Sequence, residues 1–473
     1  MSGQSTVLAA LLALTSLARA ATPVREDVRL LFGGDVLLSR QVQEEWQRRQ
    51  TSPWAGLSAL FAQADWVGGN LEGAAGKDSA CIAGESPCFA VGDALLATLP
   101  QAGFSALAHE NNHAGDLGSA GRRDTYAALA QHGVLALDFA RSPQFFRRGD
   151  YTVALIAVST VRAADGQRQQ IPSVELAQKL RLAAALANVV VVSVHWGQEL
   201  VDWPIAAQRE QAAWLVGQGA DLIVGHHPHV VQAAECIAGR PVYFSLGNLL
   251  FDQKYPQSKL GAIADCRLRD GALHCATLHT TTRPGTTYPT LADAAPSLLA
   301  GCTPPLRRGL ELNGVAVRAE PWSGATPPDT LALEGWKDGK RQWRSRRQRI
   351  LSLQPAALAG AGEASLLFTL EQHASPLDMA SGVRPYVYAV GPHGLVAKWR
   401  GSALAWPLLD ALAMAGPHSV PICALHRGDS FVMLDPSTPA TRRAAYRWNG
   451  FGFSGVDGPA TAACEALWPW TRR

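Results

Sequence analysis

Residues 221–230 read Asp-Leu-Ile-Val-Gly-His-His-Pro-His-Val, so a short apolar run is followed at once by a cluster of histidines. The run Leu222–Val224 is apolar at consecutive positions, which is typical of a strand covered on both faces. In an α/β sheet the carboxyl ends of the strands face the crevice where ligands bind. We therefore expect His226, His227 and His229 to line such a crevice.

The same arrangement, an apolar run followed by polar side chains, occurs five more times before Thr280. The residues that follow these runs are Asp35; Asn70 and Glu72; Asn111, Asn112, His113 and Asp116; His195 and Glu199; and Ser245 and Asn248. The runs alternate with helical stretches such as Val174–Ala187 and Ala206–Gly217, and this alternation predicts the α/β class. Carboxylate, amide and imidazole groups are ligands that one or two first-row divalent ions accept. We predict that these groups converge on a metal site.

Several longer motifs are similar to those of one protein family. They are Gly34-Asp35, Asn70-Leu-Glu72, Asn111-Asn-His-Ala-Gly-Asp116, His195-Trp-Gly-Gln-Glu199, Gly225-His-His-Pro-His-Val230 and Ser245-Leu-Gly-Asn248. In this order, over roughly residues 28–280, they resemble the CapA/PgsA-type capsule and poly-γ-glutamate synthesis proteins, which belong to the calcineurin-like metallophosphoesterase superfamily. The resemblance implies a sandwich of mixed sheets flanked by helices, a two-metal site, and a role in making or exporting an anionic polymer.

The resemblance also implies a role for each residue of these motifs. The implied ligands of two divalent ions (manganese, iron or zinc) are Asp35, Glu72, Asn112, His195, His227 and His229. His113 would protonate a leaving group, and Glu72 would act as a base if one metal is absent. The residues implied to bind substrate or to orient the ligands are Asn70, Asn111, Asp116, Glu199, His226, Ser245 and Asn248. His226 with His229 is an equally good register for the family's final pair of histidines.

The sequence departs from the phosphoesterase pattern at one position, and this departure leaves two functions open. Metallophosphoesterases open with Asp-x-His, whereas Asp35-Val-Leu37 carries leucine. The first function is a metal-dependent hydrolase acting on a phosphoester, or on a glutamyl amide. The second is a non-catalytic polymer-binding or assembly factor on a degenerate phosphatase scaffold. His109 and Glu110 precede the Asn-Asn-His motif and are either additional site residues or edge positions.

The N-terminus and the overall charge indicate an exported protein with no general affinity for nucleic acid. Val7–Ala18 is a mostly apolar run too short to span a bilayer, and Ala18-Arg-Ala20 fits a signal peptidase site, so residues 1–20 are predicted to be a signal peptide. We expect a periplasmic or cell-surface or secreted location, with a capsule-export membrane complex as a partner. No later stretch reaches about 18 apolar residues, so no transmembrane span is expected in the mature chain. The net charge of the 473 residues is only +3, which gives no case for nucleic acid.

The eight cysteines fit an oxidising compartment and suggest two disulfides. Cys266 and Cys275 flank Asp270-Gly271, which favours a two-residue type I′ hairpin turn. In that register the two cysteines form a non-hydrogen-bonded pair with Cα atoms about 4.5 Å apart, within disulfide range. Cys81 and Cys88 lie close together in a loop and could close it. Partners for the other four cysteines cannot be deduced from the sequence.

The residues after the α/β region have a different pattern. We expect the α/β domain to span 26–285, a linker to span 286–310, and a smaller β-rich domain to span 311–473, where eight of the fourteen tryptophans could form a separate core. Exposed aromatic rings in this domain could alternatively stack on sugars. The run 335–350 holds seven cations and one anion, so it is either a place where an anionic polymer binds or a solvated hairpin.

Overall fold

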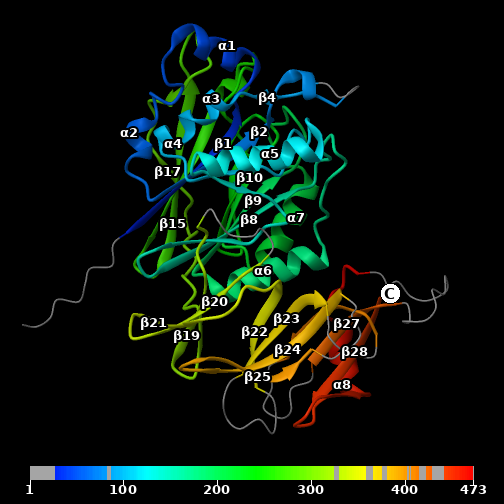
Figure 1. Cartoon of the computed structure of the whole chain (residues 1–473). Coiled ribbons are helices and arrows are strands. Elements are labelled where there is room, and N and C mark those ends of the chain that lie inside the picture. The colour runs from blue at the N-terminus through cyan, green and yellow to red at the C-terminus, as the bar shows by residue number, and fades with distance from the viewer. Residues whose placement is uncertain are drawn as a thin grey trace, which may run out of the picture.

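The structure is a computed structural model. It describes residues 27–82, 87–323, 330–357, 366–374, 381–401, 404, 406–414, 422–428 and 441–471. The signal peptide predicted for residues 1–20 lies outside the described residues. Figure 1 shows the N-terminal α/β part above a β-rich part formed by the last third of the chain.

The first sheet of the α/β part has nine strands. Across the sheet they are β16 (Pro289–Leu291), β15 (Ala272–Thr282), β14 (Leu260–Arg269), β1 (Val28–Leu37), β2 (Trp66–Glu72), β5 (Ala106–Ala108) and β6 (Leu135–Leu137), with β13 (Asn248–Leu250) beside β1 and β17 (Ser297–Leu298) beside β15. The strands β13, β1, β2, β5 and β6 are parallel, whereas β14, β15 and β16 pair in antiparallel fashion. The sheet is therefore mixed, and its parallel half carries the motifs that end in Asp35, Asn70 and Asn111.

The second sheet has six strands and is also mixed. Their order is β11 (Ala234–Ile237), β12 (Arg240–Tyr243), β10 (Leu222–His226), β9 (Val189–His195), β8 (Tyr151–Ser159) and β7 (Gln144–Arg148). The four central strands are parallel, and β11 and β7 are antiparallel edges. Both predicted histidine motifs, after His195 and at His226, therefore leave this sheet at the same end.

The two sheets pack face to face, and helices cover their outer faces. One buried cluster joins Leu30 and Phe32 of the first sheet to Leu155, Val191 and Val224 of the second. The helices on the first sheet are α1 (Arg40–Arg49), α2 (Ser58–Phe61), α3 (Asp93–Leu96), α4 (Thr98–Ala102) and α5 (Gly118–Gln131). The helices on the second sheet are α6 (Val174–Leu186) and α7 (Ala206–Gly217). The predicted α/β class is confirmed by this arrangement.

The last third of the chain, from Leu310 on, forms two antiparallel sheets and one helix. The four-stranded sheet contains β18 (Leu310–Leu312), β19 (Val315–Ala319), β20 (Leu333–Lys337) and β21 (Lys340–Arg344). The eight-stranded sheet contains β22 (Ile350–Ala356), β23 (Leu366–Ala374), β24 (Ser381–Gly391), β25 (Gly394–Arg400), β26 (Leu408–Ala413), β27 (Ile422–Arg427), β28 (Thr441–Trp448) and β29 (Phe453–Val456), followed by helix α8 (Pro459–Glu465).

The β-rich part has one core of its own and shares another with the α/β part. Phe368 and Trp448 lie in a buried cluster that contains only residues of the eight-stranded sheet. Trp343, however, lies in a larger cluster with Leu180 of α6 and Val192 of β9. The expectation of a separate aromatic core therefore holds only in part. Helix α6 packs against the second sheet on one side and against the β-rich part on the other, so the two parts share a core (Figure 1).

Part of the segment expected as a linker belongs to the first sheet. Residues of β16 and β17 pair with β15, so the segment 286–310 adds edge strands before the chain enters the β-rich part. This pairing was not visible in the sequence because strands of two and three residues carry almost no periodic signal.

Both predicted disulfides are present. Cys266 and Cys275 pair directly across the β14–β15 hairpin with Cα atoms 4.1 Å apart, and the turn residues Asp270 and Gly271 both have positive φ, as a type I′ turn requires. Cys81–Cys88 closes its loop.

Two further disulfides, Cys236–Cys302 and Cys423–Cys464, could not be predicted, because sequence separations of 66 and 41 residues give no local cue. Among the described residues, no helix has the length and apolar character needed to cross a bilayer.

Candidate functional site

The strand register brings the predicted motifs to one edge of the sandwich. In the first sheet Asp35 is the pairing partner of both Asn70 and Asn248. In the second sheet His226 pairs with His195. The polar residues at the carboxyl ends of the strands of both sheets therefore lie at the same edge of the two-sheet sandwich.

Two glycines allow the backbone to approach closely beneath Asp35. A Cβ atom on Gly34 would lie 1.9 Å from the carbonyl oxygen of Gly247, which is far inside van der Waals contact. Gly247 itself has a φ of 64°, and its carbonyl accepts a hydrogen bond of 2.9 Å from the backbone N–H of Asp35. These glycines set the distance between the loops that carry Asp35 and Asn248.

The carboxylate of Asp35 is fully buried and lies at the centre of the polar cluster. Its Oδ1 accepts a hydrogen bond of 2.9 Å from Asn70 and lies 3.2 Å from His226 Nδ1. Its Oδ2 lies 3.2 Å from His229 Nδ1 and accepts a 3.3 Å hydrogen bond from the backbone N–H of His227. Four residues from two distant segments of the chain thus converge on one carboxylate.

His229 belongs to two groups of potential metal donors. It forms one group with Asp35 and Glu72, and another with His227 and Glu199. Within each group the donor atoms lie within 4.8 Å of one another. Glu199, which the sequence placed among residues that orient the ligands, therefore offers its carboxylate beside two of the imidazoles.

Two histidines of this segment have a backbone conformation that is rare for residues other than glycine. His227 has a φ of 96° and His229 a φ of 59°. Such conformations cost roughly 1–3 kcal/mol each and are concentrated at functional sites. With this backbone the segment places the imidazoles of His226 and His229 and the backbone N–H of His227 against Asp35.

The buried charges of the cluster perturb one another strongly. Burial alone would raise the pKa of Asp35, but contacts with His226 and His229 hold it well below its usual range. Burial raises the pKa of Glu72 well above its usual range, in spite of the opposing effect of His229. Burial alone would lower the pKa of His229, but Glu72 and Asp35 raise it. A proton on His229 therefore balances part of the buried negative charge.

Two other imidazoles, those of His227 and His195, are held neutral. Burial, together with the charge of His229, lowers the pKa of His227 to about 4. Burial and His227 also hold the pKa of His195 well below its usual value. The rings of His195 and His227 lie 4.7 Å apart. Neutral imidazoles are the form that binds metal ions.

Asn112 and Asn70 are bound to His195. Asn112 Oδ1 lies 2.8 Å from His195 Nε2, and Asn70 Nδ2 lies 3.4 Å from His195 Nδ1. Asn70 Nδ2 also lies within 3.3 Å of a Glu72 oxygen, so this amide connects residues from three strands. Asn112 is thus placed with the histidines, as the resemblance implied.

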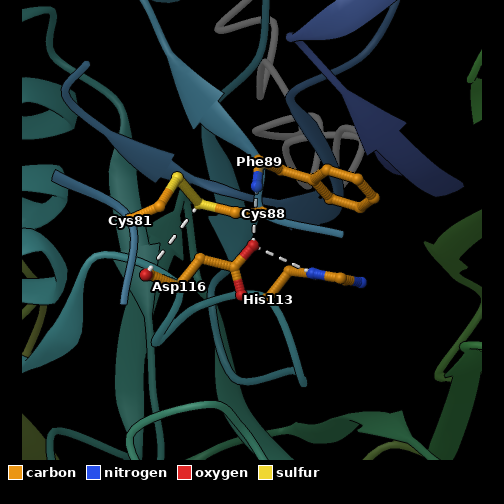
Figure 2. The surroundings of a disulfide bond; sticks show 5 residues. All are labelled: Cys81, Cys88, Phe89, His113 and Asp116. Carbon is orange, nitrogen blue, oxygen red and sulfur yellow. Dashed lines mark hydrogen bonds and ion pairs between the residues drawn. A yellow bond between two sulfur atoms is a disulfide. The ribbon is translucent and has the colours of Figure 1, made fainter. Parts of the chain in front are cut away.

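His113 forms a dyad with Asp116. His113 Nδ1 lies 3.0 Å from Asp116 Oδ2, and the same oxygen accepts a 2.7 Å hydrogen bond from the backbone N–H of Phe89 (Figure 2). The ring of Phe89 stacks on the imidazole of His113 at 3.9 Å. Phe89 follows Cys88 directly, so the Cys81–Cys88 disulfide lies next to the dyad (Figure 2).

Two of the predicted site residues, Asn111 and Ser245, hold in place the backbone around the donor cluster. Asn111 donates to the side chain of Asn70 and to the Leu71 carbonyl, and accepts from the backbone of His113. Ser245 Oγ donates to the Val230 carbonyl, which positions the end of the histidine segment.

Asn248 Oδ1 accepts a hydrogen bond of 2.9 Å from His229 Nδ1, and Asn248 Nδ2 donates to the side chain of Gln253 and to the Ser258 carbonyl. Its amide therefore touches the donor cluster directly, whereas Asn111 and Ser245 act on the backbone around it.

His109 and Glu110 point away from the cluster. His109 Nε2 lies 2.8 Å from the Gly73 carbonyl, and burial lowers the pKa of this imidazole to about 3. Glu110 accepts from the backbone of Phe139 and from Gln169. Both side chains bind groups outside the donor cluster, so neither is an additional site residue.

The sequence did not reveal the aromatic walls of the site. Phe251 lies 4.7 Å from the ring of His229, and Phe89 stacks on His113. Both rings share a buried cluster with Leu37, the residue found where phosphatases carry histidine. Of these two rings, only that of Phe251 lies close in sequence to one of the motifs, three residues after the motif Ser245–Asn248.

The donor set fits divalent cations. Glu72 Oε2 and His227 Nδ1 are buried and have no hydrogen-bond partner among the described residues. Buried polar atoms without a partner are costly. A cation held by Asp35, Glu72 and His229 would give the Glu72 carboxylate a partner, and one held by Glu199, His227 and His229 would do the same for the His227 imidazole. Oxygen and imidazole donors suit manganese, iron or zinc.

Comparisons with known proteins find similarity in the part of the chain that carries this site. Residues 29–253 match the family described as bacterial capsule synthesis protein PGA_cap. The chain is 28% identical over 269 residues to the capsule biosynthesis protein CapA of Bacillus anthracis, covering 52% of this chain and 65% of that protein. It is 28% identical over 254 residues to the PGA biosynthesis protein CapA of Bacillus subtilis, covering 50% of this chain and 67% of that protein.

The similarity lies in the α/β part of the chain. Residues 29–253, a little under half of the chain, are similar to the CapA-type bacterial capsule synthesis proteins. The alignments span about two thirds of each Bacillus relative and about half of this chain.

Proposed function

We propose that this chain is a metal-dependent hydrolase that serves the biosynthesis or export of an extracellular polymer of the poly-γ-glutamate type. The observation that carries the proposal is the pair of donor groups that share His229, Asp35–Glu72–His229 and Glu199–His227–His229. They lie at the carboxyl ends of two parallel strand sets, where α/β proteins bind ligands.

The chain's residues could hold one or two divalent ions. Asp35 and Glu72 supply carboxylates from the first sheet, while His227 and His229 supply imidazoles from the second. His195 and Asn112 offer further donors beside His227. A divalent ion bound there would polarise a phosphoryl oxygen and lower the pKa of a bound water.

The protein itself would supply proton transfer and exclusion of water. Because Asp116 holds Nδ1 of His113, the Nε2 atom of this imidazole is the one left to give a proton to a leaving group. Phe89 and Phe251 cover the imidazoles of His113 and His229 and keep bulk water from that side. The geometry therefore suits hydrolysis of a phosphoester, with a glutamyl amide as the alternative substrate.

The disulfides support an exported location. Four disulfides join all eight cysteines, which is typical of proteins that fold in an oxidising compartment. An exported protein of this kind would meet its polymer at or beyond the membrane, with a capsule-export complex as its partner.

One observation favours a second function, a non-catalytic polymer-binding or assembly factor. Leu37 is fully buried between Phe89 and Phe251, so its position offers no metal donor and the surroundings are apolar. A site that lacks this donor could hold a single ion, which binds or stabilises without turnover.

Metal content separates the two functions. We expect about two divalent ions per chain in the purified protein, measured by elemental mass spectrometry after dialysis. Asp35→Asn and His227→Gln should each remove at least one ion. His132→Gln is the matched control, because the His132 imidazole is bound to the exposed Asp93 and belongs to neither donor group.

Activity completes the test. We expect hydrolysis of a phosphodiester or a glutamyl peptide that depends on added metal and is lost in Asp35→Asn. Metal bound by the wild type, with no hydrolysis of either substrate class, would support the assembly function. No metal bound at all would contradict the hydrolase proposal.

A further inference from the structure

A groove of about 820 Å³ lies in the β-rich part, outside the donor cluster. One wall is the segment 343–348, which comprises the end of strand β21 and the residues after it. The other wall is built from strands β23, β24 and β25. We call it the arginine groove, because Arg344, Arg346, Arg347 and Arg400 line it. No aspartate or glutamate is among the described residues that line it.

The four arginines differ in how far they are neutralised. Arg344 and Arg347 both form ion pairs with one carboxylate, that of Glu320. Arg346 and Arg400 are exposed, and neither forms an ion pair with a carboxylate of the described residues. The groove therefore keeps a net positive charge, with two guanidinium groups available to a ligand.

Strand pairing fixes the position of Arg400. Arg400 pairs with Tyr386 across β24 and β25, so its side chain lies on the same face as the tyrosine ring. Gly401 follows in a left-handed conformation, and a Cβ atom there would lie 2.5 Å from the ring of Tyr386. The ring of Tyr386 therefore packs directly against the backbone of Gly401 at the base of the groove.

The floor of the groove is aromatic but closed. The rings of Tyr386 and Tyr388 are nearly parallel, with centroids 5.9 Å apart, and the two residues are only 9% and 8% exposed. The hydroxyl of Tyr386 bonds to His373, and that of Tyr388 donates to the buried carboxylate of Glu371. These rings therefore offer no open face on which a sugar or a nucleobase could stack.

A ligand of this groove must be recognised by charge. Guanidinium groups bind carboxylates through paired hydrogen bonds, and they tolerate a flexible partner whose carboxylates repeat along a chain. We propose that the arginine groove binds a segment of an acidic polypeptide, a chain of glutamyl units, through Arg346 and Arg400. The identity of that chain rests on the polymer in the proposed function, but the binding itself requires neither metal nor hydrolysis.

The test measures binding of fluorescently labelled poly-γ-glutamate to the full-length protein by anisotropy, with a chelator present throughout. Arg346→Gln/Arg400→Gln is compared with Lys337→Gln/Lys340→Gln. The control pair removes the same amount of charge, from the basic run 335–350 that also holds Arg346, but neither lysine lines the groove. Two exposed carboxylate contacts are worth about 1–2 kcal/mol together, so we expect the arginine variant to bind about tenfold more weakly.

We expect the lysine variant to bind within about twofold of the wild type at 0.1 M salt, where charges more than about 10 Å apart are screened. An equal loss in both variants would overturn the proposal, because net charge and not the groove would then be responsible. Polygalacturonate or single-stranded DNA competing as well as poly-γ-glutamate would also overturn it. If the metal test fails and this binding persists, the groove stands without the hydrolase.

Discussion

The imidazole of His113 lies 3.0 Å from the carboxylate of Asp116, and the pair is held at the edge of the donor cluster. This pairing fixes which ring nitrogen faces the site. Asp116→Asn should therefore lower kcat roughly 10- to 100-fold while metal content stays unchanged, as is typical for a residue that orients a neighbour. Steady-state kinetics with elemental analysis would check both quantities. Asp93→Asn is the matched control, because it removes a carboxylate from the exposed His132 pair; an equal effect in both would contradict a role for the dyad.

The Cys81–Cys88 disulfide should affect the same dyad through the backbone. Cys88 precedes Phe89, whose N–H binds Asp116 and whose ring stacks on His113. Cys81→Ser/Cys88→Ser should lower kcat by roughly tenfold, because small misplacements of catalytic groups are costly. Cys236→Ser/Cys302→Ser, which removes a disulfide between β11 and the end of the first sheet, should leave kcat unchanged at a temperature where both variants are folded.

Gly34 should tolerate no side chain. A Cβ atom there would lie 1.9 Å from the Gly247 carbonyl, and both partners are backbone, so neither can move aside cheaply. Gly34→Ala should lower the free energy of unfolding by at least about 2 kcal/mol, the cost of forcing atoms into a packed region. Denaturant titration would measure it. Gly92→Ala should change stability by less than about 0.5 kcal/mol, since no atom lies within 4 Å of that Cβ and its φ is negative. Similar losses in the two variants would show that the close approach is unimportant.

His426 should make the stability of the protein depend on pH. Burial lowers the pKa of this imidazole to about 4; the hydrogen bond between Nδ1 and the Trp406 carbonyl opposes the shift, and the charge of Arg442 adds to it. The unfolded chain binds a proton near pH 6.5 and the folded chain only near pH 4, so this stability is present above pH 6.5 and lost as the pH falls towards 4. The loss should approach about 3 kcal/mol.

The pH prediction is checked with a variant. His426→Gln should flatten the stability profile between pH 6.5 and pH 4 relative to the wild type, measured by denaturant titration at each pH. Buried His195 and His227 titrate in the same direction and remain in both proteins, so only the difference between the two profiles reports His426. Parallel profiles would contradict the prediction.

Much of the α/β part was predictable because its signals are local. A run such as Val189–Val194 must be covered on both faces, and the helix expected over Ala206–Gly217 forms over the same residues. The hairpin disulfide Cys266–Cys275 followed from the turn between its strands. The short edge strands, the two long-range disulfides and the packing of α6 between two sheets were not predictable, because they depend on contacts between residues far apart in the chain.

By itself, the sequence determined which side chains stand at strand ends, since apolar runs, glycines and polar residues are read along the chain. Only the tertiary structure decided that Asp35 and His229, 194 positions apart, lie 3.2 Å from each other, that Glu199 joins the imidazoles, and that His109 and Glu110 turn away. The reason is that strand identity is local, whereas strand order, register and the backbone conformation of His227 and His229 depend on how two sheets pack together.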